Sequence, residues 1–363
     1  MIYLDNAATT RPYDEVIEQT ADLMRENYFN PSSNHEMGME IDKKIKAAKE
    51  TILKRLGAAG ELIFTSGGTE SNNLVIHAKA KKHIITTKSE HPSIASSIDQ
   101  IKNNVRVDYV NLLPDGKVDL EHLKSLITDE TSLVSIIHIN NETGVIQDIN
   151  EIGKIIKQSN SKTSFHVDGV AAFGKKKINL ENVDLYTFTS HKIHGPQSVG
   201  ALFIRKNINL RPMLFGGDQQ NKVRPGTENR IGILGFATAT ELIYERLEKN
   251  IAHTTRLKEK LLEVTNDIAN IVINSGESPF ITNLSFVGLK AQVLVNVLSE
   301  NGIYVSTGAA CSGKSNWNVL KAMGKEEKIY DSAIRFSFSE FNTIEEIEKV
   351  KEVLKQNVKL LRF

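Results

Sequence analysis

Lys192 lies in the polar run at residues 189–196, between two apolar, β-branched stretches at residues 183–188 and 201–204. A lysine in this position can trap a carbonyl compound if its amine is uncharged, which requires desolvation or a cationic neighbour that lowers its pKa. His191 is a candidate for that neighbour. A solvated loop lysine is the alternative for any one of the 45 Lys and Arg residues, so the hypothesis depends on the residues that accompany Lys192.

Asp168 and His91 have the chemistry needed to assist such a lysine. Asp168 follows residues 165–167 at an expected strand end, where a carboxylate could keep a pyridine nitrogen protonated and make the ring a better electron sink. His91 stands between Glu90 and Pro92, where an imidazole could stack on a planar cofactor and transfer protons near neutral pH. Each has a structural alternative, a helix N-cap for Asp168 and a loop-bonded side chain for His91.

A glycine-rich turn at residues 65–70, Thr-Ser-Gly-Gly-Thr-Glu, ends one expected strand and opens the helix-like segment 71–79. Backbone N–H groups at such a turn can bind an anion such as phosphate, although many turns of this kind serve only as turns. The G-x-G-x-x-G spacing of dinucleotide sites and the G-K-[ST] of ATP sites are missing, which disfavours nicotinamide and ATP as ligands.

Cys311 and Arg335 complete the set of candidates. Cys311 lies among small residues at 306–313, a setting that favours an accessible, reactive thiol over a buried and inert one. Arg335 interrupts the strand-like run 333–337, and its planar guanidinium suits two-point binding of a substrate carboxylate. A structural salt bridge is the alternative for Arg335.

The composition predicts a globular protein of two domains, since 363 residues exceed the roughly 250–300 at which single cores stop growing. A net charge of +1 provides no field for a polyanion, so nucleic acid is not an expected partner. The single cysteine can form neither an internal disulfide nor a thiolate metal cluster, and no metal site is expected. Without a signal-peptide pattern or an apolar run of roughly 18–20 residues, the expected location is the cytoplasm, away from any membrane.

Seven short apolar runs alternate with helix-like segments in the first two thirds of the chain. The alternation predicts a parallel sheet with helices on both faces, and ligands of such sheets bind beyond the carboxyl ends of the strands. Because the polar candidates follow these runs, we expect them at one edge of the sheet. The expected strands are residues 62–65, 84–87, 107–112, 133–139, 165–167, 185–188 and 201–204.

The remainder of the chain predicts a second, smaller unit. A helix-prone region at residues 228–268 could carry the chain from one domain to the next. After it, strand-like and helix-like segments mix in the manner of an α+β domain. The strand-like segments are residues 281–286, 303–306 and 334–338, and the helix-like ones are residues 291–299 and 344–361.

Together these motifs resemble the cysteine desulfurases of the NifS/IscS type, pyridoxal-phosphate enzymes within the class V aminotransferase family. The resemblance runs nearly end to end, and its motifs come in the family's order. They are Tyr-Leu-Asp-Asn-Ala-Ala-Thr-Thr at 3–10, Asn-Pro-Ser-Ser at 30–33, Ser-Gly-Gly-Thr-Glu-Ser-Asn-Asn at 66–73, Asn-Asn-Glu-Thr-Gly at 140–144, His-Val-Asp at 166–168, Ser-His-Lys-Ile-His-Gly-Pro at 190–196, Arg-Pro-Gly-Thr-Glu-Asn at 224–229, the segment around Cys311 and Ile-Arg-Phe-Ser at 334–337.

The resemblance implies a role for each candidate around a pyridoxal 5'-phosphate cofactor. Lys192 would be the Schiff-base lysine, Asp168 the partner of the pyridine nitrogen and His91 the acid–base group stacked on the ring. The other cofactor-binding residues that it implies are Gly68, Thr69, Asn141, Thr189 and His191, with Thr69, Thr189 and His191 at the phosphate.

The same resemblance implies L-cysteine as the substrate and a homodimer as the assembly. Arg335 would hold the substrate carboxylate with Asn141, and Cys311 would accept the sulfur as a persulfide. That sulfur would pass to an acceptor protein, either a scaffold for iron–sulfur clusters or a tRNA-thiolation enzyme. Thr227 would reach the cofactor phosphate of the neighbouring subunit.

The implied fold is the α/β fold type I of pyridoxal-phosphate enzymes. A large cofactor-binding domain, residues 13–254, would be built on a mostly parallel seven-stranded sheet. A smaller α+β domain, residues 1–12 and 255–363, would carry the loop of Cys311 and the substrate-binding Arg335.

The chain departs from the family pattern at several positions. Ala171 stands where the family has a glutamine that donates to the phenolic oxygen of the cofactor, and the dipeptide Gln-Ser at 197–198 replaces a common Lys-Gly. Further replacements are Gln-Asn-Lys at 220–222 for Glu-Arg-Gly and Ser-Glu at 339–340 for Gly-Arg. These changes leave the expected catalytic residues intact and favour a specialised member of the family.

Two other functions stay open. One is a different pyridoxal-phosphate reaction, such as transamination or C–S β-elimination, in which Cys311 is incidental. The other is a weakly catalytic binding protein of the sulfur machinery, which Ala171 favours.

Overall fold

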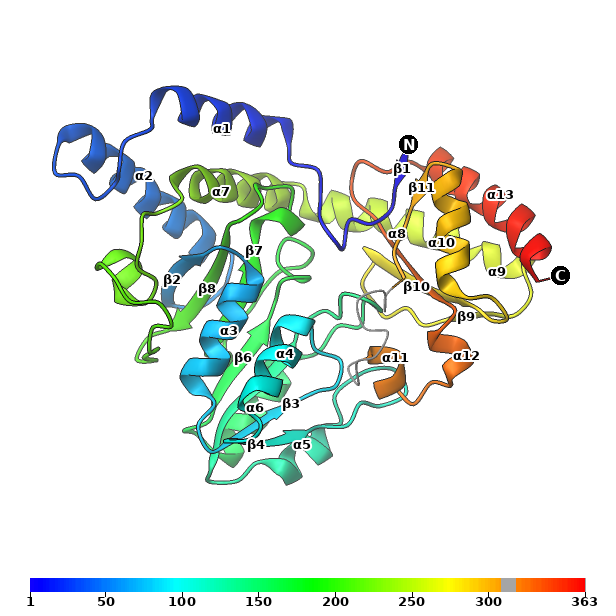
Figure 1. The fold of residues 1–363 in the computed structure, drawn as a ribbon, viewed down its shortest axis with the longest axis horizontal. Coiled ribbons are helices and arrows are strands. Elements are labelled where there is room, and N and C mark those ends of the chain that lie inside the picture. The colour runs from blue at the N-terminus through cyan, green and yellow to red at the C-terminus, as the bar shows by residue number, and fades with distance from the viewer. Residues whose placement is uncertain (308–317, 363) are drawn as a thin grey trace.

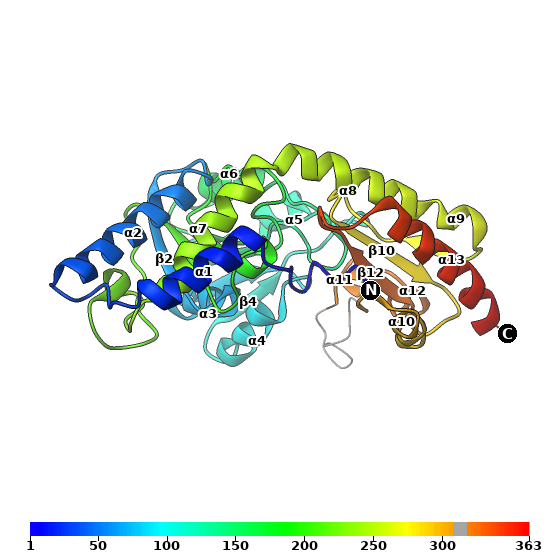
Figure 2. The ribbon, with the colours of Figure 1, turned by 90° about the horizontal axis from the view of Figure 1, so that it is seen from above.

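The protein has two lobes, seen side by side in Figure 1 and from above in Figure 2. This computed structural model describes residues 1–307 and 318–362. The larger lobe contains most of the first two thirds of the chain, and the smaller lobe contains the C-terminal part together with the N-terminus. Within the described residues, no helix combines the length and the apolar character needed to cross a membrane.

A seven-stranded sheet forms the centre of the larger lobe. Its strands are β2 (Gly60–Thr65), β3 (His83–Thr86), β4 (Arg106–Tyr109), β5 (Thr131–Ile137), β6 (Ser164–Asp168), β7 (Leu185–Thr189) and β8 (Gly200–Arg205). Their order across the sheet is β2-β8-β7-β6-β5-β3-β4, and β8 alone among them runs antiparallel to its neighbours. All seven predicted strands are present, and the predicted α/β fold with a mostly parallel sheet is confirmed.

Helices cover both faces of this sheet. They are α1 (Asp14–Glu26), α2 (Glu36–Leu53), α3 (Gly68–Lys79), α4 (Pro92–Ile101), α5 (Leu120–Leu126), α6 (Ile149–Ser159) and α7 (Arg230–Glu245). Alternate residues of a strand point to opposite faces, so Phe203 of β8 packs in the core under α2 and α7, while Leu202 packs in the core under α3 and α4. Both side chains are fully buried, which explains why the strand reads as a continuous apolar run.

The smaller lobe has its own core around a three-stranded antiparallel sheet of order β12-β10-β9 and a short parallel pair, β1 and β11. The strands are β1 (Ile2–Tyr3), β9 (Ile271–Ile273), β10 (Ile281–Phe286), β11 (Ile303–Tyr304) and β12 (Ala333–Ser337), and the helices are α8 (Leu247–Leu262), α9 (Val264–Asp267), α10 (Ala291–Glu300), α11 (Val319–Ala322), α12 (Glu327–Tyr330) and α13 (Ile344–Leu361). The helix-prone region 228–268 is thus divided into α7, α8 and α9.

The N-terminal residues belong to the core of the smaller lobe. Ile2 and Leu4 pack there with residues of α8 and α13, whereas the core of the larger lobe begins at Tyr13. The domain boundaries, 13–254 for the large domain and 1–12 with 255–363 for the small one, stay a prediction, and the boundary at 254 falls within α8.

The turn before β8 contains a strained residue. Ser198 has φ of 59° and is exposed. A residue with a Cβ in this left-handed region is disfavoured by about 1 kcal/mol relative to glycine. The family that the sequence resembles commonly has glycine at this position, so serine carries a cost in stability here.

We expect Ser198→Gly to raise the free energy of unfolding by about 0.5–1 kcal/mol, because glycine adopts a positive φ without a steric penalty. Urea denaturation would measure this change. Ser198→Ala keeps the Cβ and is the control, which we expect to unfold at the wild-type urea concentration. A Ser198→Gly protein no more stable than the wild type would show that the turn is not strained.

Candidate active site

A cavity of about 430 Å³ lies at the carboxyl edge of the seven-stranded sheet, between the two lobes. The smaller lobe contributes Ser306, Thr307 and Arg335 to its wall, and the N-terminal segment contributes Ala7 and Ala8. The predicted site residues that line it are Gly68, Thr69, His91, Asn141, Asp168, Thr189, His191, Lys192 and Arg335. Thr227 is exposed and away from this cavity, and Cys311 lies outside the described residues.

Lys192 ends a single 3-10 turn, Ser190–Lys192, that follows β7 directly. Its amine donates hydrogen bonds to the backbone carbonyls of Ala7 and Ala8, the latter at 2.7 Å. Burial, followed by the nearby charge of Arg335, lowers the pKa of Lys192 to about 8, whereas Asp5 and Asp168 oppose the shift. About a tenth of this amine is therefore neutral at pH 7 and about half at pH 8, which provides the uncharged form that carbonyl trapping requires.

The expectation that His191 is the cation that lowers the pKa of Lys192 is wrong. Burial, followed by the charge of Lys192, lowers the pKa of His191 to about 4, so its imidazole is neutral at pH 7. The cation that contributes most to lowering the pKa of Lys192 is Arg335, which comes from the smaller lobe, and Lys175 contributes less.

Asp168, the last residue of β6, is 2% exposed. Its Oδ1 accepts from the backbone N–H of Val170 at 3.0 Å, and its Oδ2 accepts from Asn72 Nδ2 at 2.8 Å. Each oxygen keeps acceptor capacity for a further donor. The helix N-cap considered for Asp168 is not formed, since a turn follows it.

A chain of hydrogen bonds links Asp168 to His91. The Nδ2 of Asn72 also donates to Ser93 Oγ at 2.9 Å, and Ser93 Oγ lies 2.8 Å from His91 Nδ1. His91 Nδ1 accepts from the backbone N–H of Ser93 as well, at 3.1 Å, so it has no proton of its own in the neutral ring. The chain therefore fixes the tautomer, with the N–H of His91 on Nε2.

The imidazole of His91 lines the cavity, and its surroundings favour the neutral form. Desolvation lowers its pKa, with Asp168 raising it and Lys192 lowering it to smaller extents. Its side chain caps α4 by accepting from the backbone N–H of Ser93, so the loop role considered for His91 is also present. The two roles use different atoms of the ring, since Nδ1 caps the helix and Nε2 is left for a ligand.

The first turn of α3 provides a place for an anion. Helical N–H groups in the first turn have no intrahelical acceptor and carry partial positive charge. Gly68 opens the helix, and a Cβ there would come within 2.7 Å of Val170 Cγ2, so this position requires glycine. Thr69 is exposed beside it, and His191 uses Nδ1 to contact Thr9 Oγ1 at 3.2 Å, which leaves its Nε2 available. Thr189 donates its hydroxyl to the carbonyl of Val199 at 3.0 Å.

Arg335 of β12 reaches the cavity from the smaller lobe and is already partly engaged. Its Nη1 donates to the backbone carbonyl of Asn141 at 2.9 Å, and its Nη2 pairs with Asp5 Oδ1 at 2.7 Å. The salt bridge that was the alternative for Arg335 is therefore present together with its position in the cavity wall.

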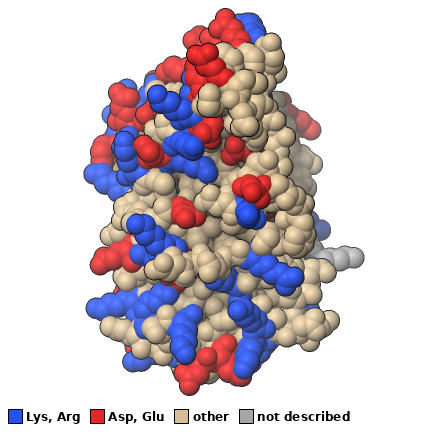
Figure 3. Space-filling model, turned by 90° about the vertical axis from the view of Figure 1, so that its left-hand side faces the viewer, with Lys and Arg blue, Asp and Glu red and all other residues tan. Residues whose placement is uncertain are grey.

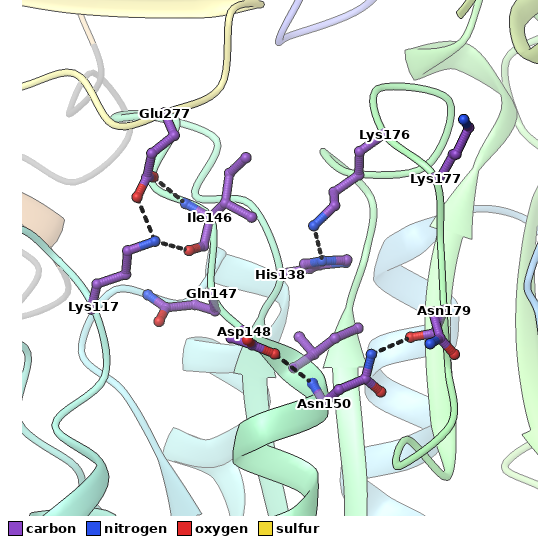
Figure 4. A pocket seen from close by; sticks show the side chains of 11 residues that line it. Lys117, His138, Ile146, Gln147, Asp148, Asn150, Lys176, Lys177, Asn179 and Glu277 are labelled. Carbon is purple, nitrogen blue, oxygen red and sulfur yellow. Dashed lines mark hydrogen bonds and ion pairs between the residues drawn. The ribbon is translucent and has the colours of Figure 1, made fainter.

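The loop that presents Asn141 is fastened to the smaller lobe. Glu277 accepts from the backbone N–H of Ile146 at 3.1 Å and pairs with Lys117 at 2.5 Å, while Lys117 also donates to the carbonyl of Ile146 (Figure 4). Further along, the N–H of Gly276 donates to Thr143 at 2.7 Å. These contacts make the position of Asn141 depend on both lobes.

Three polar residues of the site have no role in the predictions. Asn72 is 1% exposed and connects His91 with Asp168. Burial raises the pKa of Glu90 to about 8 and that of Glu142 to about 7, and both line the cavity. Asn72 and Glu142 stand inside recognised motifs and Glu90 precedes His91 in the sequence, and these positions are the signal that could have identified them.

Comparison with known proteins agrees with this geometry. The sequence pattern of the class V aminotransferase family matches residues 2–350. A protein of Trichormus azollae described as cysteine desulfurase is 37% identical, over 100% of this chain and 94% of that protein. A solved structure described as a NifS-like protein superposes with a TM-score of 0.93 at 36% identity, covering 99% of this chain and 100% of the other. Another, described as SspA in complex with cysteine, has a TM-score of 0.82 at 27% identity, covering 94% and 100%.

The chain therefore belongs to the class V aminotransferase family. Within that family it groups with the cysteine desulfurases of the NifS/IscS type.

The pKa of Lys192 predicts how its reactivity depends on pH. An amine with a pKa of about 8 instead of 10.5 is about half neutral at pH 8 and about nine-tenths neutral at pH 9. We expect labelling of Lys192 in the cofactor-free protein by an aldehyde, trapped with borohydride and read by peptide mass spectrometry, to reach half of its plateau near pH 8 and to level off by about pH 9. The exposed Lys43 is the internal control. Parallel profiles for the two lysines would contradict the assignment.

Proposed function

We propose that this protein is a pyridoxal-phosphate-dependent cysteine desulfurase, which converts L-cysteine to L-alanine and leaves the sulfur on Cys311 as a persulfide. The observation that carries the proposal is the meeting of Lys192, Asp168 and Arg335 in one cavity, with the pKa of Lys192 lowered to about 8. Membership of the family and the cysteine complex of the related SspA support it.

The residues of the cavity fit pyridoxal 5'-phosphate. The start of α3 with Gly68 and Thr69 suits its phosphate, together with Thr189 and His191. Asp168 would hold the pyridine nitrogen, His91 would stack on the ring and Asn141 would bind the phenolic oxygen. When bound, this cofactor would supply an electron sink for the negative charge that develops at the α-carbon of the substrate.

Lys192 would be the base of the reaction. It would bond the cofactor between turnovers and, once freed, take the proton from the substrate α-carbon, for which a pKa near the working pH is suited. The carbonyls of Ala7 and Ala8 would then accept hydrogen bonds from the resulting ammonium. His91, with its N–H on Nε2, would donate protons from the other side of the site.

Arg335 and Asn141 would hold the substrate by its carboxylate, so that the thiol of the substrate faces the segment that follows Thr307. The Cys311 thiolate would form a bond to the substrate sulfur as the bond between that sulfur and the β-carbon breaks. Protons from Lys192 and His91 would complete alanine. The persulfide would then be passed to a sulfur-acceptor protein, a scaffold or a tRNA-thiolation enzyme.

We further propose a homodimer in which Thr227 completes the phosphate site of the partner subunit. Thr227 is exposed, and its segment is anchored by the ion pair of Arg224 with Glu70 at 2.9 Å. Large apolar side chains are exposed nearby in the chain, among them Leu214 and Phe215, which are 51% and 81% exposed. Figure 3 shows this end of the molecule, where basic and acidic side chains are spread over otherwise uncharged surface.

Alanine release tests the proposed activity. We expect the purified protein to release L-alanine from L-cysteine in the presence of a reductant, whereas Cys311→Ala and Lys192→Ala should each lose more than about 99% of the rate, since each removes a reacting group. Alanine would be measured by amino-acid analysis of the reaction mixture. Pyruvate and ammonia as products, or full activity in Cys311→Ala, would favour another pyridoxal-phosphate reaction, and no product from any amino acid would favour a binding protein.

Thr227→Ala tests the shared site. Loss of a hydrogen bond to a charged phosphate costs about 1.5–3 kcal/mol, so we expect the affinity for pyridoxal phosphate to fall about tenfold or more. Equilibrium dialysis would measure the affinity, and sedimentation would check that the dimer persists. Thr128→Ala, at another exposed threonine, is the control. Unchanged affinity in a dimeric Thr227→Ala protein would refute the shared site.

A further inference from the structure

Asp5 forms an ion pair with the guanidinium of Arg335, the group that the proposed function assigns to the carboxylate of the substrate. Its Oδ1 lies 2.7 Å from Arg335 Nη2, and the side chains of Arg335 and Asp5 are 8% and 23% exposed. The backbone holds Asp5 in this place, because Leu4 accepts a hydrogen bond from the N–H of Ser337 at 2.7 Å and Asp5 forms a parallel bridge with the same residue. The pair is therefore built into the core of the smaller lobe and is not an incidental surface contact.

Arg335 still has donors for a ligand. One hydrogen of Nη1 goes to Asn141 and one of Nη2 goes to Asp5. The second hydrogens of both atoms are left, and Nε is buried without a hydrogen-bond partner among the described residues. A carboxylate that enters the cavity therefore shares the guanidinium with Asp5.

Asp5 also acts on the second cation of the site. Its carboxylate favours the charged form of Lys192, against the effects of burial and of Arg335. The site thus places two cations, Arg335 and Lys192, near two anions, Asp5 and Asp168, and of these two anions Asp5 is the one that pairs with the guanidinium. An entering carboxylate is attracted by the cations and repelled by Asp5, whereas an ammonium group is attracted by Asp5.

We propose that Asp5 is a specificity-determining residue, which makes the cavity favour a zwitterionic α-amino acid over a simple carboxylate anion. The inference rests on the proposed function, because it takes Arg335 as the binding group for the substrate carboxylate. Discrimination arises from repulsion of the wrong ligand as much as from attraction of the right one.

Propionate is the probe that tests this role. It has the carboxylate without the ammonium and the thiol, so turnover and Cys311 do not affect its binding. Calorimetry on the protein with its cofactor would give the dissociation constant. We expect Asp5→Asn to bind propionate about tenfold more tightly than the wild type, because the repulsion by Asp5 is removed and both arms of Arg335 become available.

Two controls separate specificity from structural support. Asp5→Glu keeps the negative charge and should bind propionate as the wild type does. Asp14→Asn removes an exposed carboxylate that pairs with Arg11 at 2.6 Å, and it should change nothing. Asp5→Ser would take the place of Asp5→Asn if that variant did not fold.

The direction in which the affinity for propionate changes distinguishes a role of Asp5 in specificity from a role in structural support. If Asp5 only supports the fold of Arg335, its removal weakens the binding of every carboxylate. Propionate binding by Asp5→Asn that is equal to or weaker than that of the wild type, including no binding by either, would overturn the proposal. Tighter propionate binding together with no alanine from the wild type would instead refute the desulfurase function and leave Arg335 and Asp5 as a carboxylate site.

Discussion

The site depends on the removal of one lysine from water. An amine on the surface is protonated at neutral pH and can neither take a proton from carbon nor bond a carbonyl. Burial lowers the pKa of Lys192 to about 8, and the second contribution comes from Arg335, which belongs to the other lobe. The carbonyls of Ala7 and Ala8 come from the N-terminal segment that also packs on the smaller lobe. The pKa of Lys192 therefore depends on groups from both lobes, and the larger lobe alone does not determine it.

A second constraint on the site is the direction of each hydrogen bond, from donor to acceptor, in the chain that links His91 and Asp168. Asn72 has two hydrogens on Nδ2 and uses one for Ser93 and the other for Asp168. Because an amide cannot change its donors into acceptors, this arrangement holds Asp168 as an acceptor and fixes the tautomer of His91. The N–H of His91 is thus on Nε2 before any ligand binds, which lowers the reorganisation needed during a reaction.

Much of the larger lobe could be predicted from the sequence, because its strands are buried on both faces and are continuous apolar runs, as β8 illustrates. The helices α1 and α2 are not among the predicted elements, and α1 shows why, since its buried residues are only Val16 and Leu23. The strand predicted at 303–306 is shorter, as β11 ends at Tyr304 and Ser306 instead bridges to Arg335.

In the site, residue types and strand ends were enough to bring Lys192, Asp168 and Arg335 together, but not to find their partners. Asp5 meets Arg335 across most of the length of the chain, and no local pattern contains that information. The error at His191 has a related cause, since a histidine beside a lysine in sequence is neutral when both are desolvated.

The arrangement of Arg335 also explains how the lobes and the ligand depend on each other. The guanidinium holds the loop of Asn141 through one arm and the N-terminal segment through the other, and a carboxylate ligand would add a third partner. Loss of any partner leaves a buried cation less well compensated, which is costly at a site only 6% exposed. Under the proposed function, the group that would bind the substrate carboxylate is therefore also a group that joins the two lobes.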